Sequence, residues 1–180
     1  MREEIRLAGF GGQGIILAGM ILGKAAAIYD GNEAVFSQSY GPEARGGACA
    51  AEVIICDYQV DYPLFEEADI AVAMSQEAFH KYGSLVKPEG IILLDSTLVH
   101  ADAVKARARS APFTRIAEGL GNKMAANVVM LGFLTGATGV VSREAMEESI
   151  RTTVRARFVD LNLRAFAQGY ELAKEPEAVR

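Results

Sequence analysis

The segment IRLAGFGGQG, residues 5–14, decides the fold that this sequence predicts. Residues 5–10 are mostly apolar and end beside glycine, a pattern that is typical of a buried β-strand. The glycines that follow predict a tight turn, and the small and apolar residues from about Gln13 to Tyr29 predict a helix. A strand joined through a glycine turn to a helix is the first unit of an α/β fold.

Further strands and helices alternate along the rest of the chain. Strands are predicted over residues 34–38, 48–56, 70–74, 90–95 and 112–116, with a short helix over 76–86 and C-terminal helices over 121–135, from Ser142, and over about 153–174. This alternation implies a mostly parallel sheet with helices on both sides. We therefore predict a single domain over residues 1–180, with C-terminal helices at about 142–174. Its fold class is a three-layer α/β/α architecture with a mostly parallel, Rossmann-like sheet.

The last helix carries an apolar stripe that has two interpretations. The stripe consists of Val159, Leu163, Phe166, Tyr170 and Ala173. Such a stripe usually faces the core of its own domain, and it can also pack against another chain.

The composition predicts a folded domain with few side chains for chemistry. Of the 180 residues, 51% are hydrophobic and 23% are charged, which is enough to bury a full core and excludes disorder. The chain has two His and two Cys, whereas an iron–sulfur cluster needs four cysteine ligands. We expect His80 and His100 to lie on the surface and Cys56 to be a small buried packing residue. A self-contained metal or iron–sulfur enzyme is therefore not expected.

Charge and hydropathy argue against nucleic-acid and membrane partners. The net charge is −5, whereas a domain that grips a nucleic-acid backbone is usually basic. The basic residues Lys105, Arg107 and Arg109 are interpreted as a solvated helix face. The chain starts without a secretory signal and has no apolar run long enough for a bilayer, and two isolated cysteines fit a reducing compartment. We expect a cytoplasmic protein.

The first glycine loop matches a dinucleotide-binding pattern only in part. Gly9, Gly11 and Gly14 fit G-x-G-x-x-G between a predicted strand and helix, where backbone N–H groups and the helix dipole favour an anion. Dinucleotide binding also requires an acidic residue at the end of the second strand, where this chain has Ser37-Gln38-Ser39. A small NAD(P)-dependent oxidoreductase remains an alternative, as does a glycine turn with no ligand.

A second glycine-rich loop follows the second predicted strand. In it Glu43 and Arg45 are flanked by Gly41, Gly46 and Gly47. Arg45 could hold a phosphate or carboxylate through two parallel hydrogen bonds, or it could pair with Glu43 inside the loop. Both loops follow strands, so we expect them at the carboxyl edge of the sheet, where ligands of such sheets bind.

Three segments together resemble one family. GGQG at 11–14, QSYGPEARGG at 38–47 and ANVVMLG at 126–132 resemble the gamma subunit of 2-oxoacid:ferredoxin oxidoreductases, and the likeness runs from about residue 4 to 173. VDYP at 60–63 and LDS at 94–96 look most similar to the gamma subunit of 2-oxoglutarate:ferredoxin oxidoreductase. A gamma-type subunit for indolepyruvate or pyruvate is the alternative within the family.

The resemblance implies a noncatalytic subunit of a larger enzyme. Such enzymes convert a 2-oxoacid and coenzyme A to an acyl-CoA and carbon dioxide while reducing ferredoxin. Thiamine diphosphate and iron–sulfur clusters would lie on the partner alpha and beta subunits, with a delta subunit in some complexes, and this chain alone would hold no cofactor or metal.

The resemblance also suggests a surface for coenzyme A or for a partner. Asn127 is expected to be a buried polar residue that either bonds loop backbone or contacts the ligand directly. The residues predicted to form this surface are Gly11, Gly12, Gln13, Gly14, Ser39, Tyr40, Gly41, Glu43, Arg45, Gly46, Gly47 and Asn127.

Overall fold

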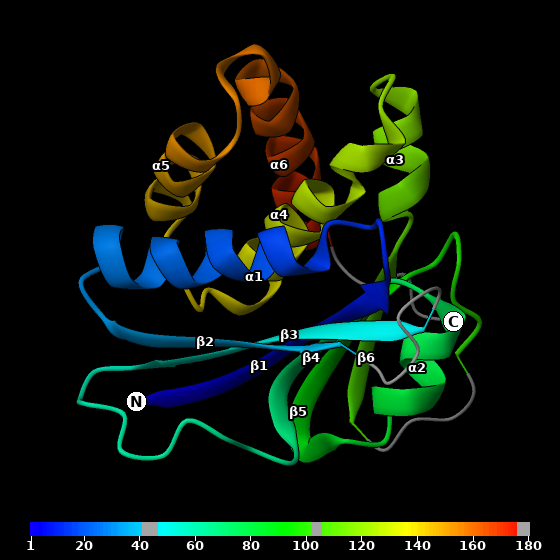
Figure 1. Cartoon of the computed structure of the whole chain (residues 1–180). Coiled ribbons are helices and arrows are strands. Elements are labelled where there is room, and N and C mark those ends of the chain that lie inside the picture. The colour runs from blue at the N-terminus through cyan, green and yellow to red at the C-terminus, as the bar shows by residue number, and fades with distance from the viewer. Residues whose placement is uncertain (41–46, 102–105, 176–180) are drawn as a thin grey trace.

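One sheet organises the chain in a computed structural model that describes residues 1–40, 47–101 and 106–175 (Figure 1). Within these residues six strands lie in the order β2-β3-β1-β4-β5-β6. Their bounds are β1 Arg2–Phe10, β2 Glu33–Tyr40, β3 Ala48–Cys56, β4 Ala68–Ala73, β5 Val86–Asp95 and β6 Arg107–Ala111. The pairs β1–β4, β4–β5 and β5–β6 are parallel, whereas β3 is antiparallel to both β1 and β2. Every described strand except β3 therefore runs in the same direction.

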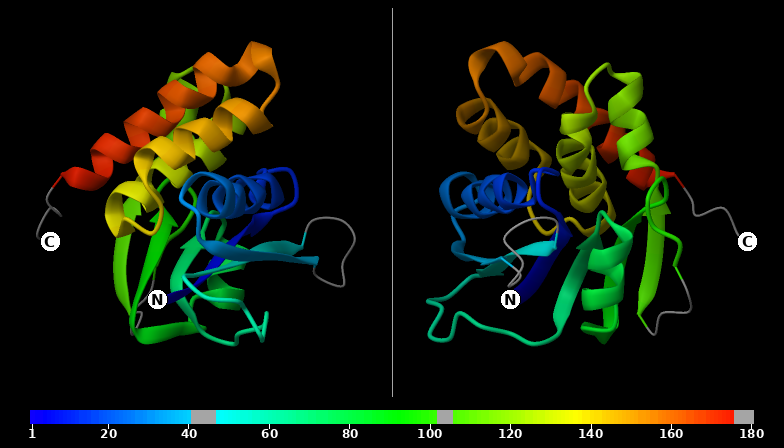
Figure 2. Two further views of the ribbon diagram at one scale, coloured as in Figure 1. Left: turned by 90° about the vertical axis from the view of Figure 1, so that its left-hand side faces the viewer. Right: turned by 45° about the vertical axis from the view of Figure 1, so that its right-hand side comes forward.

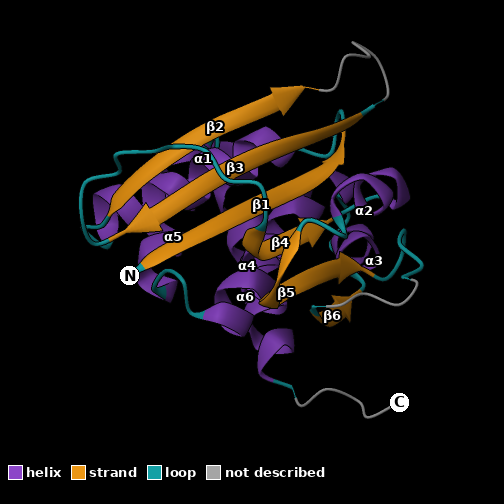
Figure 3. Cartoon of the chain, turned by 90° about the horizontal axis from the view of Figure 1, so that it is seen from below, coloured by secondary structure: helices purple, strands orange, loops and turns teal. Residues whose placement is uncertain are grey.

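Helices cover both faces of the sheet unequally (Figures 1 and 2). One face carries a thick layer made of α1 Ile15–Lys24, the π-helical η1 Ala25–Tyr29, α3 Phe113–Gly119, η2 Lys123–Ala125, α4 Ala126–Thr138, α5 Arg143–Thr153, η3 Ala156–Phe158 and α6 Val159–Lys174. Among the described helices, α2 Gln76–Tyr82 alone lies on the opposite face, where Figure 3 shows it at one end of the sheet. The three-layer α/β/α fold is confirmed.

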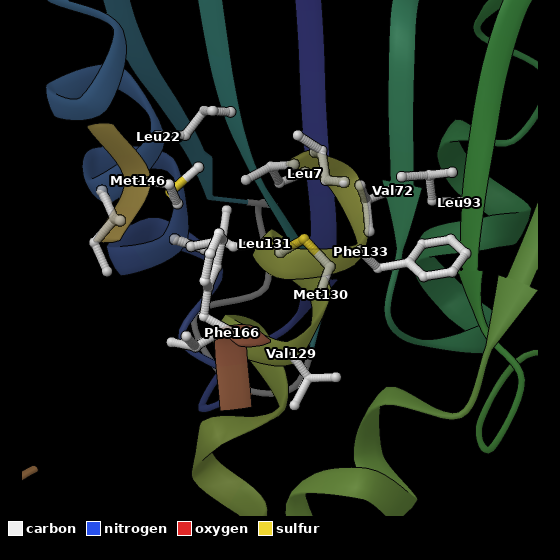
Figure 4. Packing of buried hydrophobic residues seen from close by; sticks show 14 of the residues in the cluster. Leu7, Leu22, Val72, Leu93, Val129, Met130, Leu131, Phe133, Met146 and Phe166 are labelled. Atoms are coloured by element: carbon white, nitrogen blue, oxygen red, sulfur yellow. The ribbon is translucent and has the colours of Figure 1, made fainter. Parts of the chain in front are cut away.

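The main core lies between the sheet and the thick helical layer. Helix α4 is buried from Ala126 to Thr135, so it fills the centre of that layer. Figure 4 shows Leu131 and Phe133 of α4 facing Leu7 and Val72 of the sheet. A smaller apolar cluster, which includes Phe79 of α2, covers part of the other face. Burial of this much apolar surface is the dominant stabilising contribution to such a fold.

Close contact between α4 and α6 depends on two glycines. A Cβ at Gly132 would overlap the carbonyl oxygen of Phe166 and lie 2.9 Å from the backbone nitrogen of Tyr170. A Cβ at Gly169 would overlap the carbonyl oxygen of Val129. Backbone therefore packs on backbone at this crossing. In the apolar stripe of α6, Phe166 and Ala173 are buried in the core and Leu163 and Tyr170 pack against it. The core interpretation is therefore confirmed for these four residues but not for Val159.

The strand predicted over residues 112–116 is wrong. Residues 113–119 form α3, whose Phe113 and Ala117 lie one helical turn apart and are both buried. The last described strand is β6, which contains Arg107 and Arg109, so the helix predicted at these two residues is also wrong. Lys105 lies outside the described residues. An edge strand exposes much of its surface and can carry charges, which is why its sequence looks like a polar helix.

Three predicted helices have different limits from those in the structure. The helix predicted over 121–135 is α4, which begins at Ala126 after η2 and runs to Thr138. The helix predicted over 76–86 ends at Tyr82, and Val86 already belongs to β5. Pro88 is accommodated in β5 because the β4–β5 register shifts there, between the pairs Ala68–Val86 and Ile70–Ile91. The final helix begins at Val159, and residues 154–158 instead form the turn and η3 that follow α5.

Candidate functional site

The first glycine loop forms a sharp turn between β1 and α1. Gly12 has a φ of 97° and Gly14 a φ of 72°, both in the left-handed region that side chains rarely adopt. Gly14 is the N-cap of α1, so the loop delivers the chain directly to the amino end of that helix. The free backbone N–H groups and positive dipole end found at such a terminus favour an anion.

Gln13 has a structural role in this loop. Its Oε1 accepts a hydrogen bond from the backbone N–H of Phe10 at 3.0 Å, and its Nε2 donates to the carbonyl oxygen of Met74 at 2.7 Å. Gln13 thereby ties the ends of the parallel strands β1 and β4 together. The contact with a ligand predicted for Gln13 remains a prediction, and both ends of its amide already have a partner in the protein.

Asn127 holds the same loop from the other side. The side chain is 4% exposed, and its Nδ2 donates to the carbonyl oxygen of Gly14 at 3.1 Å. A Cβ at Gly14 would lie only 2.5 Å from that nitrogen, so glycine is required by space as well as by backbone angle. Bonding to loop backbone is one of the two roles expected for Asn127, and the structure shows it.

The outer surface of the loop is open. Gly11 and Gly12 are exposed, and among the described residues nothing beyond the adjacent positions lies within 4 Å of a Cβ built at either glycine. A ligand could therefore approach the backbone here without displacing any side chain that the structure describes.

The strands that lead into the two glycine loops end next to each other. Gly9 of β1 and Tyr40 of β2 both pair with Cys49, near the start of β3. The carboxyl ends of β1 and β2 thus lie on either side of Cys49, at the same edge of the sheet. The prediction that both loops start at one edge is therefore confirmed for the strand ends from which they start. Ser39 lies exposed in β2, and Gly47 directly precedes β3. The predicted residues Gly41, Glu43, Arg45 and Gly46 lie outside the described residues.

Other reactive side chains near this edge are committed to structural contacts. Burial raises the pKa of the Cys49 thiol, which disfavours the nucleophilic thiolate. Asp95, at the end of β5, is fully buried. Its carboxylate accepts hydrogen bonds from the backbone N–H and Oγ1 of Thr114, at 3.1 and 2.5 Å, and from the backbone N–H of Thr97 at 3.0 Å. His80 and His100 are exposed, as predicted.

Sequence reasoning missed a groove next to Gly14. This groove, of about 450 Å³, is named here the α1–η3 groove. It was hidden by the prediction of a continuous helix over 153–174, because residues 154–158 form part of its wall. Its lining comprises Gly14, Leu17, Asn122, Met124, Ala125, Asn127, Thr153, Val154, Arg155, Phe158, Leu161 and Asn162.

The described part of the chain gives two further observations. It contains no helix that combines the length and the apolar character needed to cross a membrane. Within the same residues, His, Cys, Asp and Glu side chains form no group of three or more that could hold a metal ion.

Comparison with known proteins identifies the family. The model of the pyruvate ferredoxin/flavodoxin oxidoreductase family matches residues 4–172. The 2-oxoglutarate synthase subunit KorC of Methanocaldococcus jannaschii is 52% identical over 97% of this chain and 96% of its own length. The ketoisovalerate oxidoreductase subunit VorA of Methanothermobacter thermautotrophicus is 36% identical over 96% of this chain, which corresponds to 36% of that longer protein.

A solved structure agrees with these sequence matches. The gamma subunit of a keto/oxoacid ferredoxin oxidoreductase from Geobacter sulfurreducens superimposes with a TM-score of 0.89 at 44% identity, covering 96% of this chain and 97% of that one. The fold and the family resemblance inferred from the glycine loops are therefore both confirmed. This chain belongs to the pyruvate ferredoxin/flavodoxin oxidoreductase family.

Proposed function

We propose that this chain is the gamma-type subunit of a cytoplasmic 2-oxoglutarate:ferredoxin oxidoreductase. The observation that carries the proposal is the end-to-end match, at 52% identity, with a 2-oxoglutarate synthase subunit. The ketoisovalerate relative is only 36% identical, so the sequence favours 2-oxoglutarate over a branched 2-oxoacid. The complex oxidatively decarboxylates 2-oxoglutarate in the presence of coenzyme A, giving an acyl-CoA and carbon dioxide.

Within this complex the chain is a noncatalytic subunit. Thiamine diphosphate and the iron–sulfur clusters belong to the alpha and beta subunits, and to a delta subunit where one is present, and ferredoxin accepts the electrons. The roles of Cys49 and Asp95 support this assignment, because burial disfavours the thiolate and the carboxylate already accepts three hydrogen bonds. The chain contributes surfaces that position other groups.

One such surface binds coenzyme A at the two glycine loops. Coenzyme A carries phosphate groups, and the exposed backbone at Gly11 and Gly12 leads to the amino end of α1, where an anion is favoured. Asn127 keeps the loop in place through Gly14. Arg45, in the connection that joins β2 to β3, would supply a bidentate cation for the same phosphates.

Purification of the chain from its own cells tests the assignment as a subunit. We expect the tagged chain to copurify with a thiamine-diphosphate-binding subunit and with iron–sulfur protein. The preparation should reduce ferredoxin in a reaction that needs both 2-oxoglutarate and coenzyme A. Absence of a thiamine-binding partner would refute the subunit assignment, and faster turnover of pyruvate or indolepyruvate would refute the choice of substrate.

A Gly11→Leu variant tests the coenzyme A surface. The new Cβ meets no neighbouring atom in the part of the chain that the structure describes, and the backbone of Gly11 lies outside the left-handed region, so the fold should tolerate the change. We expect the KM for coenzyme A to rise about tenfold, because the loss of one charge-assisted hydrogen bond has that magnitude. Assembly and the KM for 2-oxoglutarate should not change.

Gly119→Leu is the matched control, since a Cβ there also has no neighbour within 4 Å among the described residues, and Gly119 lies outside the predicted surface. An unchanged KM for coenzyme A in the Gly11→Leu complex, or an equal increase in the control, would contradict the proposal.

A further inference from the structure

The α1–η3 groove is unusually apolar for the surface of a soluble chain. Leu17 is 38% exposed, Met124 61% and Phe158 37%, and all three line it. They come from α1, η2 and η3, three elements that are far apart in the sequence and together line the groove. Scattered apolar residues are normal on a protein surface, but a continuous apolar groove marks a binding surface.

The apolar surface continues along α1 beyond the groove. Met20, one turn after Leu17, is 50% exposed on the same helix. A surface helix normally presents charged or polar residues on the side turned away from the core. The exposed side of α1 therefore has the composition of an interface.

Two arginines at the rim have no acidic partner among the described residues. Arg155 lines the groove, and the guanidinium of Arg157 lies 4.7 Å from the centre of the Phe158 ring. Neither arginine forms an ion pair with the acidic side chains in the described parts of the chain, whereas nearby Arg151 pairs with Glu148 at 3.4 Å. The whole chain carries a net charge of −5, so this rim differs in sign from the rest of the molecule.

We propose that the α1–η3 groove docks an acidic, apolar-faced segment of another subunit of the same complex. Apolar side chains of that segment enter between Leu17, Met124 and Phe158, and its carboxylates meet Arg155 and Arg157. Carboxylate is the partner for which the planar guanidinium is best suited at an interface. This inference rests on the proposed function, which supplies the partner subunits.

A second copy of the chain is a poorer occupant. The connection from Asp57 to Glu67 has exposed Tyr58 and Tyr62 among carboxylates, so its chemistry would suit the groove. However, this connection passes below the sheet in Figure 1, whereas α1 and η3 lie above it. A contact between these surfaces on two copies would be head-to-tail, and such contacts form open filaments unless a rotation closes them.

The test uses the complete complex, purified through a tag on the thiamine-binding subunit. Arg155→Glu reverses the charge at the groove. We expect it to raise the dissociation constant of this chain from the complex at least about tenfold, with a smaller effect at high salt. Met124→Glu introduces a carboxylate at an exposed position and should act in the same direction. Thermal unfolding of each purified variant establishes that it is folded.

Arg164→Glu is the matched control. Arg164 is exposed on α6, does not line the groove and forms no ion pair with a described side chain, yet the change in net charge is the same. Its complex should retain the dissociation constant of the wild type. Unchanged affinity in Arg155→Glu, or an equal loss in Arg164→Glu, would overturn the docking proposal.

Two further measurements separate the other occupants. An intact Arg155→Glu complex with a raised KM for coenzyme A would identify the groove as a ligand site and overturn docking. A wild-type dimer of the isolated chain that Arg155→Glu dissociates, with the complex unaffected, would identify a second copy and also overturn it. If the wild-type chain fails to join any thiamine-binding subunit, the proposed function fails as well, whereas the variant results above leave that function standing.

Discussion

Replacement of Gly132 by alanine should destabilise the chain at the crossing of α4 and α6. The added Cβ would lie well inside the 3.0 Å limit that real Cβ contacts respect, and its nearest neighbours are backbone atoms of Phe166 and Tyr170. Backbone atoms inside a helix cannot rotate out of the way as a side chain can. The two helices must therefore separate, which loosens their contact along its whole length.

The expected size of the effect follows from two opposing contributions. Overpacking of a core usually costs about 1–3 kcal/mol, and the rigid neighbours place this case at about 3. Alanine recovers about 1 kcal/mol of helix propensity relative to glycine. The free energy of unfolding should fall by about 2 kcal/mol, which for a chain of this length lowers the Tm by about 4–8 °C.

Thermal and urea unfolding of the purified chain, followed by circular dichroism, measure this change. Gly169→Ala should behave in the same way, because its Cβ would overlap the carbonyl oxygen of Val129 at the same crossing. In the double variant the free energy of unfolding should fall by less than the sum of the two single decreases, since the first substitution already separates the helices. Gly119→Ala has free space and should not lower the Tm. A Tm for Gly132→Ala at or above that of the wild type would refute the reasoning.

Two other predictions concern charged residues on β1. Arg6 is buried and pairs with Glu52 at 2.8 Å, so Arg6→Met should lower the free energy of unfolding by about 3 kcal/mol. Adding Glu52→Met should recover part of that loss, because it removes the carboxylate left without its partner. Urea unfolding of both proteins measures the two changes. Burial and the nearby Asp69 carboxylate raise the pKa of Glu3, so the folded state favours its protonated form and loses stability as the pH rises through this pKa. Glu3→Gln should therefore raise the Tm at about pH 7 and leave it unchanged at about pH 3, below the ordinary pKa of glutamate; an equal change at both pH values would contradict this.

The sequence predicts an element well where its apolar residues are the ones that become buried. The strand over 48–56 is found with the same bounds, because all its residues except Glu52 are buried and are apolar or small. The strand over 112–116 fails because Pro112 and Phe113 resemble a short strand, although the burial of Phe113 and Ala117 follows a helical period. Strand β6 is not predicted, because its residues are largely polar and its contacts are with distant parts of the chain. Arg109 packs over the ring of Phe133 and donates to the carbonyl oxygen of Ala173, contacts that no local pattern reveals.

The site is predictable only as far as it is local. The glycine turn at 11–14 and its position at the carboxyl edge follow from strand, turn and helix in sequence. The contact of Asn127 with Gly14 joins residues that are far apart, so sequence reasoning could state a backbone role but could not name the partner. The α1–η3 groove depends on the break between α5 and α6. The apolar periodicity of the sequence predicts a continuous helix there, so it hides the groove.

The antiparallel position of β3 has an evolutionary consequence. Because β3 lies between β1 and β2, the ends of two strands from separate parts of the chain flank Cys49, while eight or more residue pairs on each side fix the strand register. Substitutions in the segments that follow β1 and β2 can alter the chemistry of this edge without shifting the sheet, since loops tolerate change far better than the strands that carry them. A shared scaffold can thus diversify its binding chemistry by point changes at one edge.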